Sequence, residues 1–169
     1  YASAMGVKNL KDIFHSDDVV EAVKDGETLS LGNMELTFME TRMIHWPDSM
    51  FTYLEKDQLL FSQDAFGMHL ATFERFVDEL PMEMIRYEAA TYYANIVLPY
   101  SPVVLKTLEK VSASGWKIKI FAPDHGPIWR KDIGVILDLY KTWALQKAVN
   151  KAVVLYATMW HSTEKMAKA

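Results

Sequence analysis

Two hydrophobic periodicities divide this chain, and the division falls near residue 65. Before it, apolar and polar residues alternate in short runs bounded by turn residues, which is the pattern of β-strands. The predicted strands cover residues 19–23, 29–31, 34–39, 50–54 and 59–61. Gly32 and Asn33 lie between the second and third runs and predict a hairpin, because both residue types tolerate positive φ angles. We therefore expect a short helix over residues 7–14, followed by a small sheet.

Beyond residue 84 the apolar residues recur at spacings of three and four, which is typical of amphipathic helices. The predicted helices cover residues 84–98, 102–114 and 131–146. Gly115 follows the second helix in the position of a C-cap. A short strand is expected over residues 117–121, between the second and third helices. Strands and helices together indicate an α/β fold.

Residues 152–156 form a continuous apolar run after the polar stretch 146–151. Such a run is typical of a strand buried on both faces of a parallel sheet. Only a short loop and the start of a helix follow, and a strand without neighbours cannot fold alone. We therefore predict one domain over residues 1–147 and the truncated start of a second domain over residues 148–169.

Composition excludes several classes of partner and cofactor. The chain has no cysteine, which rules out disulfides, thiolate zinc sites and iron–sulfur ligation within it. Its net charge of −4 argues against nucleic acid, because binding a polyanion requires a basic patch. No apolar run is long enough to cross a bilayer, and the amino end lacks the order of a secretory signal. We expect a cytoplasmic protein without a membrane partner, whose metal ligands are His, Asp or Glu.

Three potential metal ligands follow three predicted strands. His45 comes after the run 34–39, Asp64 after 59–61, and His125 after 117–121. Neutral imidazole is a good terminal ligand of iron and similar ions, and a carboxylate has two oxygens that can bridge a metal pair. The alternatives are that each histidine is a surface or hydrogen-bonded residue and that Asp64 caps a turn.

A second constellation lies between the apolar run 152–156 and the last predicted helix. Backbone N–H groups at a helix N-terminus are unpaired, and the helix dipole favours an anion, so a phosphate fits there. The residues that would hold it are Thr158, Met159, Trp160, His161, Ser162 and Thr163. The alternative is that Ser162 or Thr163 is an ordinary helix N-cap.

Two further residues are candidates for a substrate pocket. His69 follows Asp64 closely, and a phenol from Tyr92 or Tyr93 could donate a hydrogen bond to a bound diatomic ligand; we select Tyr93. The alternatives are a partly exposed loop position for His69 and core packing for both tyrosines.

Four segments carry a resemblance to a known family. They are His45 to Tyr53, Leu60 to Gly67, Ala122 to Arg130 and Tyr156 to Thr163. In the same order and at similar spacing, these segments resemble flavodiiron proteins. The resemblance implies the C-terminal half of a metallo-β-lactamase-like αββα sandwich over residues 1–147. Over residues 148–169 it implies the first strand and phosphate loop of a flavodoxin-like FMN domain.

The same resemblance implies the roles of the candidate residues. His45 and His125 would be terminal ligands of two different non-haem iron ions, Asp64 would bridge the two ions, and residues 158–163 would bind FMN. The family's other ligands come from a His-x-Glu-x-Asp-His motif, which this sequence lacks. His161 and Ala157 also depart from the family, which more often has a small residue and an acidic residue there.

The activity implied is reduction of dioxygen to water, of nitric oxide to nitrous oxide, or of both. Electrons would come through FMN from a donor such as rubredoxin or a flavin reductase, in a homodimer or homotetramer. Two other functions stay open from the residues alone. One is a zinc hydrolase of the metallo-β-lactamase superfamily, and the other is a non-catalytic FMN-binding electron carrier or structural fragment.

Overall fold

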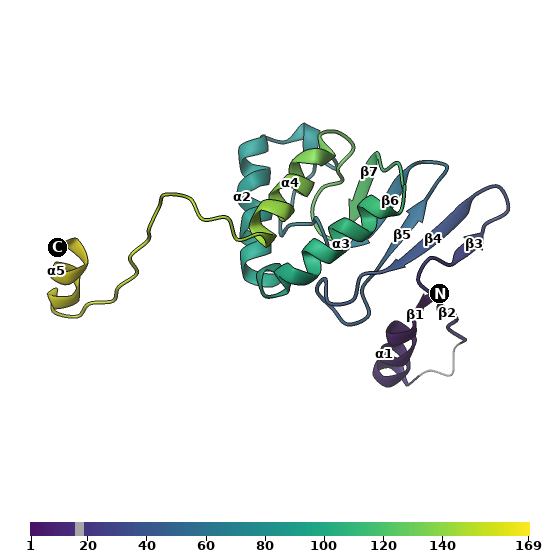
Figure 1. Ribbon diagram of the computed structural model, residues 1–169, viewed down its shortest axis with the longest axis horizontal. Coiled ribbons are helices and arrows are strands. Elements are labelled where there is room, and N and C mark those ends of the chain that lie inside the picture. The colour runs from purple at the N-terminus through teal and green to yellow at the C-terminus, as the bar shows by residue number, and fades with distance from the viewer. Residues whose placement is uncertain (16–18) are drawn as a thin grey trace.

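A five-stranded sheet is the centre of the molecule in the computed structural model, which describes residues 1–15 and 19–169 (Figure 1). The strands lie in the order β3-β4-β5-β6-β7. Their bounds are β3 Thr28–Ser30, β4 Glu35–Glu40, β5 Met50–Leu54, β6 Leu59–Gln63 and β7 Ile120–Pro123. Strands β3 to β6 pair antiparallel, and β7 pairs parallel to β6. A parallel pair needs a long crossover, which the helices between β6 and β7 provide.

The predicted hairpin is confirmed. β3 and β4 pair antiparallel, with Leu29 opposite Leu36 and Ser30 opposite Glu35. The turn between them includes Gly32 at φ +88°, a conformation that glycine adopts without a Cβ clash. The strand predicted over residues 50–54 is confirmed as β5, with the same bounds.

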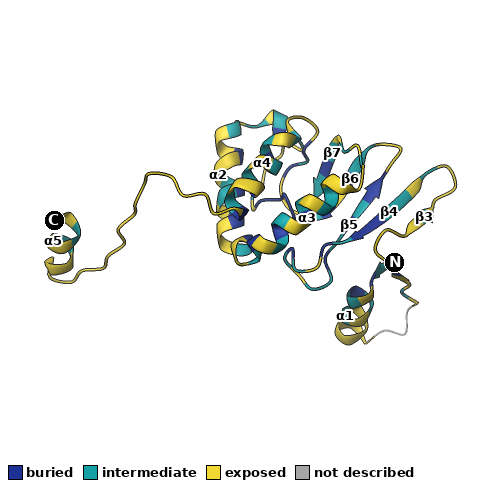
Figure 2. Ribbon diagram, viewed as in Figure 1, coloured by how far each residue is buried: buried dark blue, intermediate teal, exposed yellow. Residues whose placement is uncertain are grey.

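Three helices pack against one face of this sheet (Figure 2). They are α2 Met82–Tyr92, α3 Ser101–Ala113 and α4 Ile133–Ala144. A 3₁₀ turn, Val77–Glu79, precedes α2, and a π-helical turn, Tyr93–Val97, and a 3₁₀ turn, Leu98–Tyr100, join α2 to α3. Tyr53 on β5, Leu60 on β6 and Phe121 on β7 lie opposite one another on neighbouring strands. Their side chains face the helices and belong to the core. The mixed α/β class is confirmed.

The opposite face of the sheet is more open. Phe61 on β6 pairs with Thr52 on β5, and both side chains point away from the helical layer because strand side chains alternate. Phe61 is 42% exposed, although it lies in the middle of a five-stranded sheet. A sheet with helices on one face and exposed apolar side chains on the other is half of a sandwich.

The amino end forms a small unit beside the sheet. β1 Ala2–Ser3 pairs parallel with β2 Ala22–Val23, and α1 Ala4–Phe14 lies between them in the chain. The predicted helix 7–14 is therefore confirmed and extended by a turn, because the Ser3 side chain accepts a hydrogen bond from the Gly6 amide and caps it. The predicted strand over 19–23 is reduced to two residues.

The carboxyl end leaves the body of the molecule as an extended segment before α5 Ser162–Lys168 (Figure 1). The strand predicted over residues 152–156 is wrong for this structure, because these residues pair with no described strand. Leu155, at its centre, is 92% exposed. A buried strand needs neighbours on both sides, and none of the described residues supplies them. Among the described helices, none is both long and apolar enough to cross a membrane.

Candidate metal centre

The three candidate ligands converge at one edge of the sheet. β4 and β6 both run antiparallel to β5, so they point the same way, and β7 is parallel to β6. The carboxyl ends of β4, β6 and β7 therefore meet at one edge. His45 lies in the loop after β4, Asp64 directly follows β6, and His125 follows β7.

Asp64 lies between the two histidines. Its Oδ2 atom is 3.2 Å from His45 Nε2, and its Oδ1 atom is 3.2 Å from His125 Nε2. The side chains of His45 and Asp64 are each 16% exposed, whereas that of His125 is 52% exposed. Each carboxylate oxygen thus faces a different imidazole nitrogen, which is the donor arrangement that a carboxylate bridging two metal ions requires.

The described residues do not complete such a site. In residues 1–15 and 19–169, no three His, Asp or Glu side chains are grouped so that they could hold one metal ion. Each imidazole nitrogen lies next to a different Asp64 oxygen. Each ion position therefore has two donor atoms, one from a histidine and one from Asp64. Protein-bound zinc takes about four ligands, and octahedral ions take six. The residues present fit one side of a two-ion site, and further ligands must come from elsewhere.

Hydrogen bonds within the loop between β4 and β5 fix the position of His45. The Thr41 amide donates to the Ser49 carbonyl over 3.0 Å and closes the loop at its base. The Trp46 amide donates to Ser49 Oγ over 3.1 Å, and the Met43 amide donates to the Trp46 carbonyl over 2.7 Å. Ser49, which is buried, takes part in two of these three bonds and so ties the loop to its base.

Two glycines allow the loops after β6 and β7 to touch. The Met68 amide donates to the His125 carbonyl over 3.2 Å. A Cβ on Gly67 would lie 2.7 Å from the same carbonyl oxygen, and a Cβ on Gly126, at φ +81°, would lie 2.7 Å from Met68 Cγ. No side chain fits at either position. The contact places Asp64 and His125 on adjoining loops.

A cavity of about 380 Å³ opens beside the site. Its lining includes Asp64, Trp46 and residues of α1. Asp124 also lines it, and burial raises the pKa of that carboxyl, as does the nearby charge of Asp64, while His125 lowers it. Three aspartates, Asp48, Asp64 and Asp124, line the cavity. It is therefore acidic and favours cations.

Tyr92 is the tyrosine that lies at this site. Its ring centroid is 4.8 Å from that of His69 and 6.5 Å from that of His45. The side chain is buried, and its hydroxyl has no hydrogen-bond partner among the described residues. Burial raises the pKa of the phenol, and the charges of Asp64 and Asp124 raise it further.

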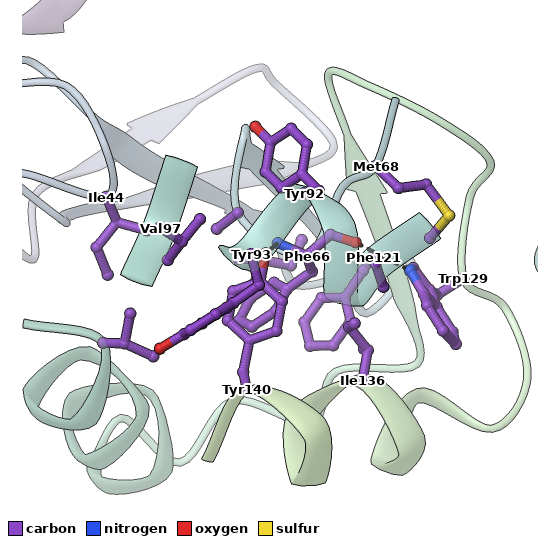
Figure 3. Close-up of a cluster of buried hydrophobic side chains, with 14 of the residues drawn as sticks. Ile44, Phe66, Met68, Tyr92, Tyr93, Val97, Phe121, Trp129, Ile136 and Tyr140 are labelled. Carbon is purple, nitrogen blue, oxygen red and sulfur yellow. Dashed lines mark hydrogen bonds between the residues drawn. The ribbon is translucent and has the colours of Figure 1, made fainter. Parts of the chain in front are cut away.

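Tyr93, selected from the sequence, occupies a different position. Its hydroxyl lies 3.0 Å from Ser101 Oγ, and its ring packs against Tyr140 and Trp143 in the core. Figure 3 shows the phenols of Tyr92 and Tyr93 pointing in different directions from the end of α2. Adjacent helical residues face different sides, and the sequence shows both as apolar, so periodicity alone did not separate them.

The other predicted pocket residue, His69, lies beside Tyr92 and His125. It is exposed, and its ring centroid is 5.8 Å from that of His125 and 4.8 Å from that of Tyr92. The structure therefore brings His45, Asp64, His69 and His125 together. It adds Tyr92 to this group and leaves Tyr93 outside it.

The proposed phosphate-binding residues 158–163 are all exposed and lie at the start of α5. The N-cap of this helix is His161, whose side chain makes no capping hydrogen bond. The prediction that Ser162 or Thr163 is the N-cap is therefore wrong. His161 Nδ1 is 2.7 Å from Glu164 Oε2, so an acidic group already lies beside the helix N-terminus.

The fold and the ligand geometry together define a metallo-β-lactamase-like α/β domain. Residues 6–126 match the family described as ODP family beta lactamase. The chain belongs to this family.

Named relatives make the assignment more specific. The chain is 50% identical over 155 residues to a nitric oxide reductase of Moorella thermoacetica, covering 92% of this chain and 39% of that protein. A solved rubredoxin oxygen:oxidoreductase from Desulfovibrio gigas aligns at 44% identity with a TM-score of 0.95, covering 99% of this chain and 42% of that one. A flavodiiron protein from Giardia intestinalis aligns at 34% identity with a TM-score of 0.80, covering 85% and 35%. These relatives confirm the resemblance to flavodiiron proteins.

The chain spans only about two fifths of the length of the curated relatives it matches. The matched portion contains His45, Asp64 and His125.

Proposed function

We propose that this chain supplies one half of the ligand set of a non-haem diiron site in a flavodiiron oxidoreductase. The observation that carries the proposal is the position of Asp64, with one carboxylate oxygen facing His45 and the other facing His125. The reaction is reduction of dioxygen to water, of nitric oxide to nitrous oxide, or of both. Relatives named for each of these two substrates support it.

Three side chains hold the ions. His45 and His125 would each hold a different ion, and Asp64 would contribute to holding both, since each of its oxygens lies 3.2 Å from one of the two imidazoles. When bound, the iron pair supplies one-electron steps and positive charge next to a diatomic substrate. The negative charge of Asp64 offsets part of that positive charge and fixes the separation of the two histidines.

Tyr92 would donate a hydrogen bond from its hydroxyl to a diatomic substrate in the site. Its unpartnered hydroxyl lies on a ring that neighbours both His45 and His69. A phenol with an ordinary pKa is already protonated at physiological pH, so the hydroxyl can act as a donor. His69, which is exposed, packs its ring against that of Tyr92.

Residues 158–163 bind the phosphate of FMN once the rest of a flavodoxin-like domain, beginning near residue 148, surrounds them. Their place after the apolar run 152–156 and the likeness to flavodiiron proteins support this role. Rubredoxin or a flavin reductase supplies the electrons, in a cytoplasmic homodimer or homotetramer. The relative named rubredoxin-oxygen oxidoreductase supports the first donor.

The test uses the complete natural polypeptide that carries this chain. We expect two iron ions and one FMN per polypeptide, and consumption of dioxygen or nitric oxide when either gas is added to protein that has been reduced anaerobically. His45→Ala and His125→Ala should each lower the iron content and abolish consumption. Two zinc ions without flavin, together with hydrolytic activity, would contradict the proposal and support a hydrolase.

A further inference from the structure

Gln63 contacts all three loops of the metal centre. It is the last residue of β6 and directly precedes Asp64 in the chain. Its side-chain Oε1 accepts a hydrogen bond from the Met50 amide over 2.7 Å. Its backbone carbonyl accepts a hydrogen bond from the Asp124 amide over 2.8 Å.

These two bonds lie where the β5–β6 pairing has ended and the β6–β7 pairing is irregular. β5 and β6 pair only from Leu54 opposite Leu59 to Thr52 opposite Phe61, so Met50 lies beyond the last paired residues. The pairing of β6 with β7 shifts register between Phe61 and Gln63. Met50 stays opposite Glu40 on β4, and Gln63 stays opposite Pro123 on β7. The Gln63 side chain adds the hydrogen bond that joins the start of β5 to the end of β6.

The two partners of Gln63 lie next to the two histidine loops. Met50 ends the loop that carries His45, and Asp124 immediately precedes His125. Gln63 itself has φ +49°, which turns the chain sharply before Asp64. One residue thus joins the Asp64 backbone to both flanking loops.

We propose that Gln63 is a positioning residue that keeps His45 and His125 on opposite sides of Asp64; the proposal rests on the diiron function proposed above. Its backbone bond fixes the His125 loop, and its side-chain bond fixes the His45 loop. Loss of the side-chain bond leaves the Met50 amide without this acceptor and lets the His45 loop move relative to Asp64. Groups that orient ligands in this way typically change metal affinity by about 10 to 100-fold when removed.

Gln58, at the other end of β6, provides a matched control. It directly precedes the strand and also has a positive φ, of 53°. Its carbonyl likewise accepts backbone hydrogen bonds, from the amides of Lys119 and Ile120. Its side-chain Oε1, however, has no hydrogen-bond partner in the part of the chain that the structure describes. The two glutamines differ in the contact that the proposal invokes.

The experiment compares Gln63→Met and Gln58→Met in the complete natural polypeptide. The first readout is hydrogen exchange of the Met50 amide in the iron-free protein, which does not depend on the proposed function. The second readout is iron affinity, measured by competition with a chelator. We expect Gln63→Met to speed exchange at Met50 and to lower iron affinity about tenfold. Gln58→Met should match the wild type in both.

Gln63→Glu tests whether the acceptor itself is what matters. Its carboxylate can accept the same hydrogen bond, so it should restore the protection of the Met50 amide and the retention of iron. Unchanged exchange at Met50 in Gln63→Met, or equal loss of iron affinity in the two Met variants, would overturn the proposal. A wild-type protein that binds no iron would contradict the diiron function itself. Iron bound with unchanged affinity in Gln63→Met would contradict only the role of Gln63.

Discussion

Gly126 lies directly against Met68: a Cβ on Gly126 would come within 2.7 Å of Met68 Cγ and 2.9 Å of the Met68 carbonyl oxygen. Gly126 also has φ +81°, where any other residue is strained. We therefore expect Gly126→Ala to lower the free energy of unfolding by about 1–3 kcal/mol and to weaken metal binding, because the loops of Asp64 and His125 must separate. Thermal unfolding and iron content measure the two effects.

Gly134 serves as the control for that substitution. It lies in the first turn of α4, and an added Cβ would meet no described atom within 4 Å. Gly134→Ala should raise the free energy of unfolding by about 0.5–1 kcal/mol, since alanine loses less conformational entropy in a helix. Shifts of the same sign and size in both variants would show that the contact with Met68 does not constrain the site.

The neighbouring tyrosines Tyr92 and Tyr93 should respond in opposite ways to removal of their hydroxyls. Tyr93→Phe removes the hydrogen bond to Ser101 and should cost about 1 kcal/mol of stability with little change in turnover. Tyr92→Phe removes a hydroxyl that has no described partner, so stability should change little. Turnover should fall about tenfold or more, because a hydrogen bond to a charged or polarised ligand contributes roughly 1.5–3 kcal/mol. A loss of turnover in Tyr93→Phe alone would contradict the role proposed for Tyr92.

Asp78 makes part of the protein's stability depend on pH. Arg130 binds it through two hydrogen bonds, of 2.9 and 3.2 Å, and the Lys131 ammonium lies 2.9 Å away. These cations lower the pKa of Asp78 from 3.8 to about 2 in the folded protein. A lowered folded-state pKa stabilises the fold fully above the unfolded value, and this stabilisation disappears as the pH falls through about 2.

Denaturant titrations at several pH values test this effect. Asp78→Asn should be less stable than the wild type above pH 4, and the difference should shrink to nothing near pH 2. Asp138→Asn, at an exposed position of α4 and outside the ion pairs of the described residues, is the control for loss of a surface carboxylate. A constant difference between Asp78→Asn and the wild type at every pH would contradict the assignment.

The sequence predicted much of the sheet because alternation and turn residues are local signals, and the three candidate ligands were selected by a local signal of the same kind. Alternation fixed residues 50–54 as a strand, and turn residues fixed the hairpin at Gly32. The ligands His45, Asp64 and His125 each follow a strand, so their place in the chain was readable. Their convergence was expected from their place after strands and from the resemblance to flavodiiron proteins, but the pattern alone did not establish it, because it depends on which strands run in the same direction.

Other features could not be read from local pattern. The choice between Tyr92 and Tyr93 depends on the helix phase at the junction of α2 with the π-helical turn, and both side chains are buried. The Gln63 contacts depend on a register shift between strands that are distant in sequence. Residues 152–156 are apolar enough for a buried strand, but a strand also needs neighbours that the described chain does not provide.

The most direct test of the central claim is the magnetic state of iron in the complete natural polypeptide, with Asp138→Asn as a surface control. We predict two irons that are coupled through Asp64 in the wild type and in the control, measured by Mössbauer spectroscopy. Asp64→Asn should lose the coupling and at least half of the iron, because an amide is a poor bridge between two cations. Two coupled irons at wild-type occupancy in Asp64→Asn would contradict the account.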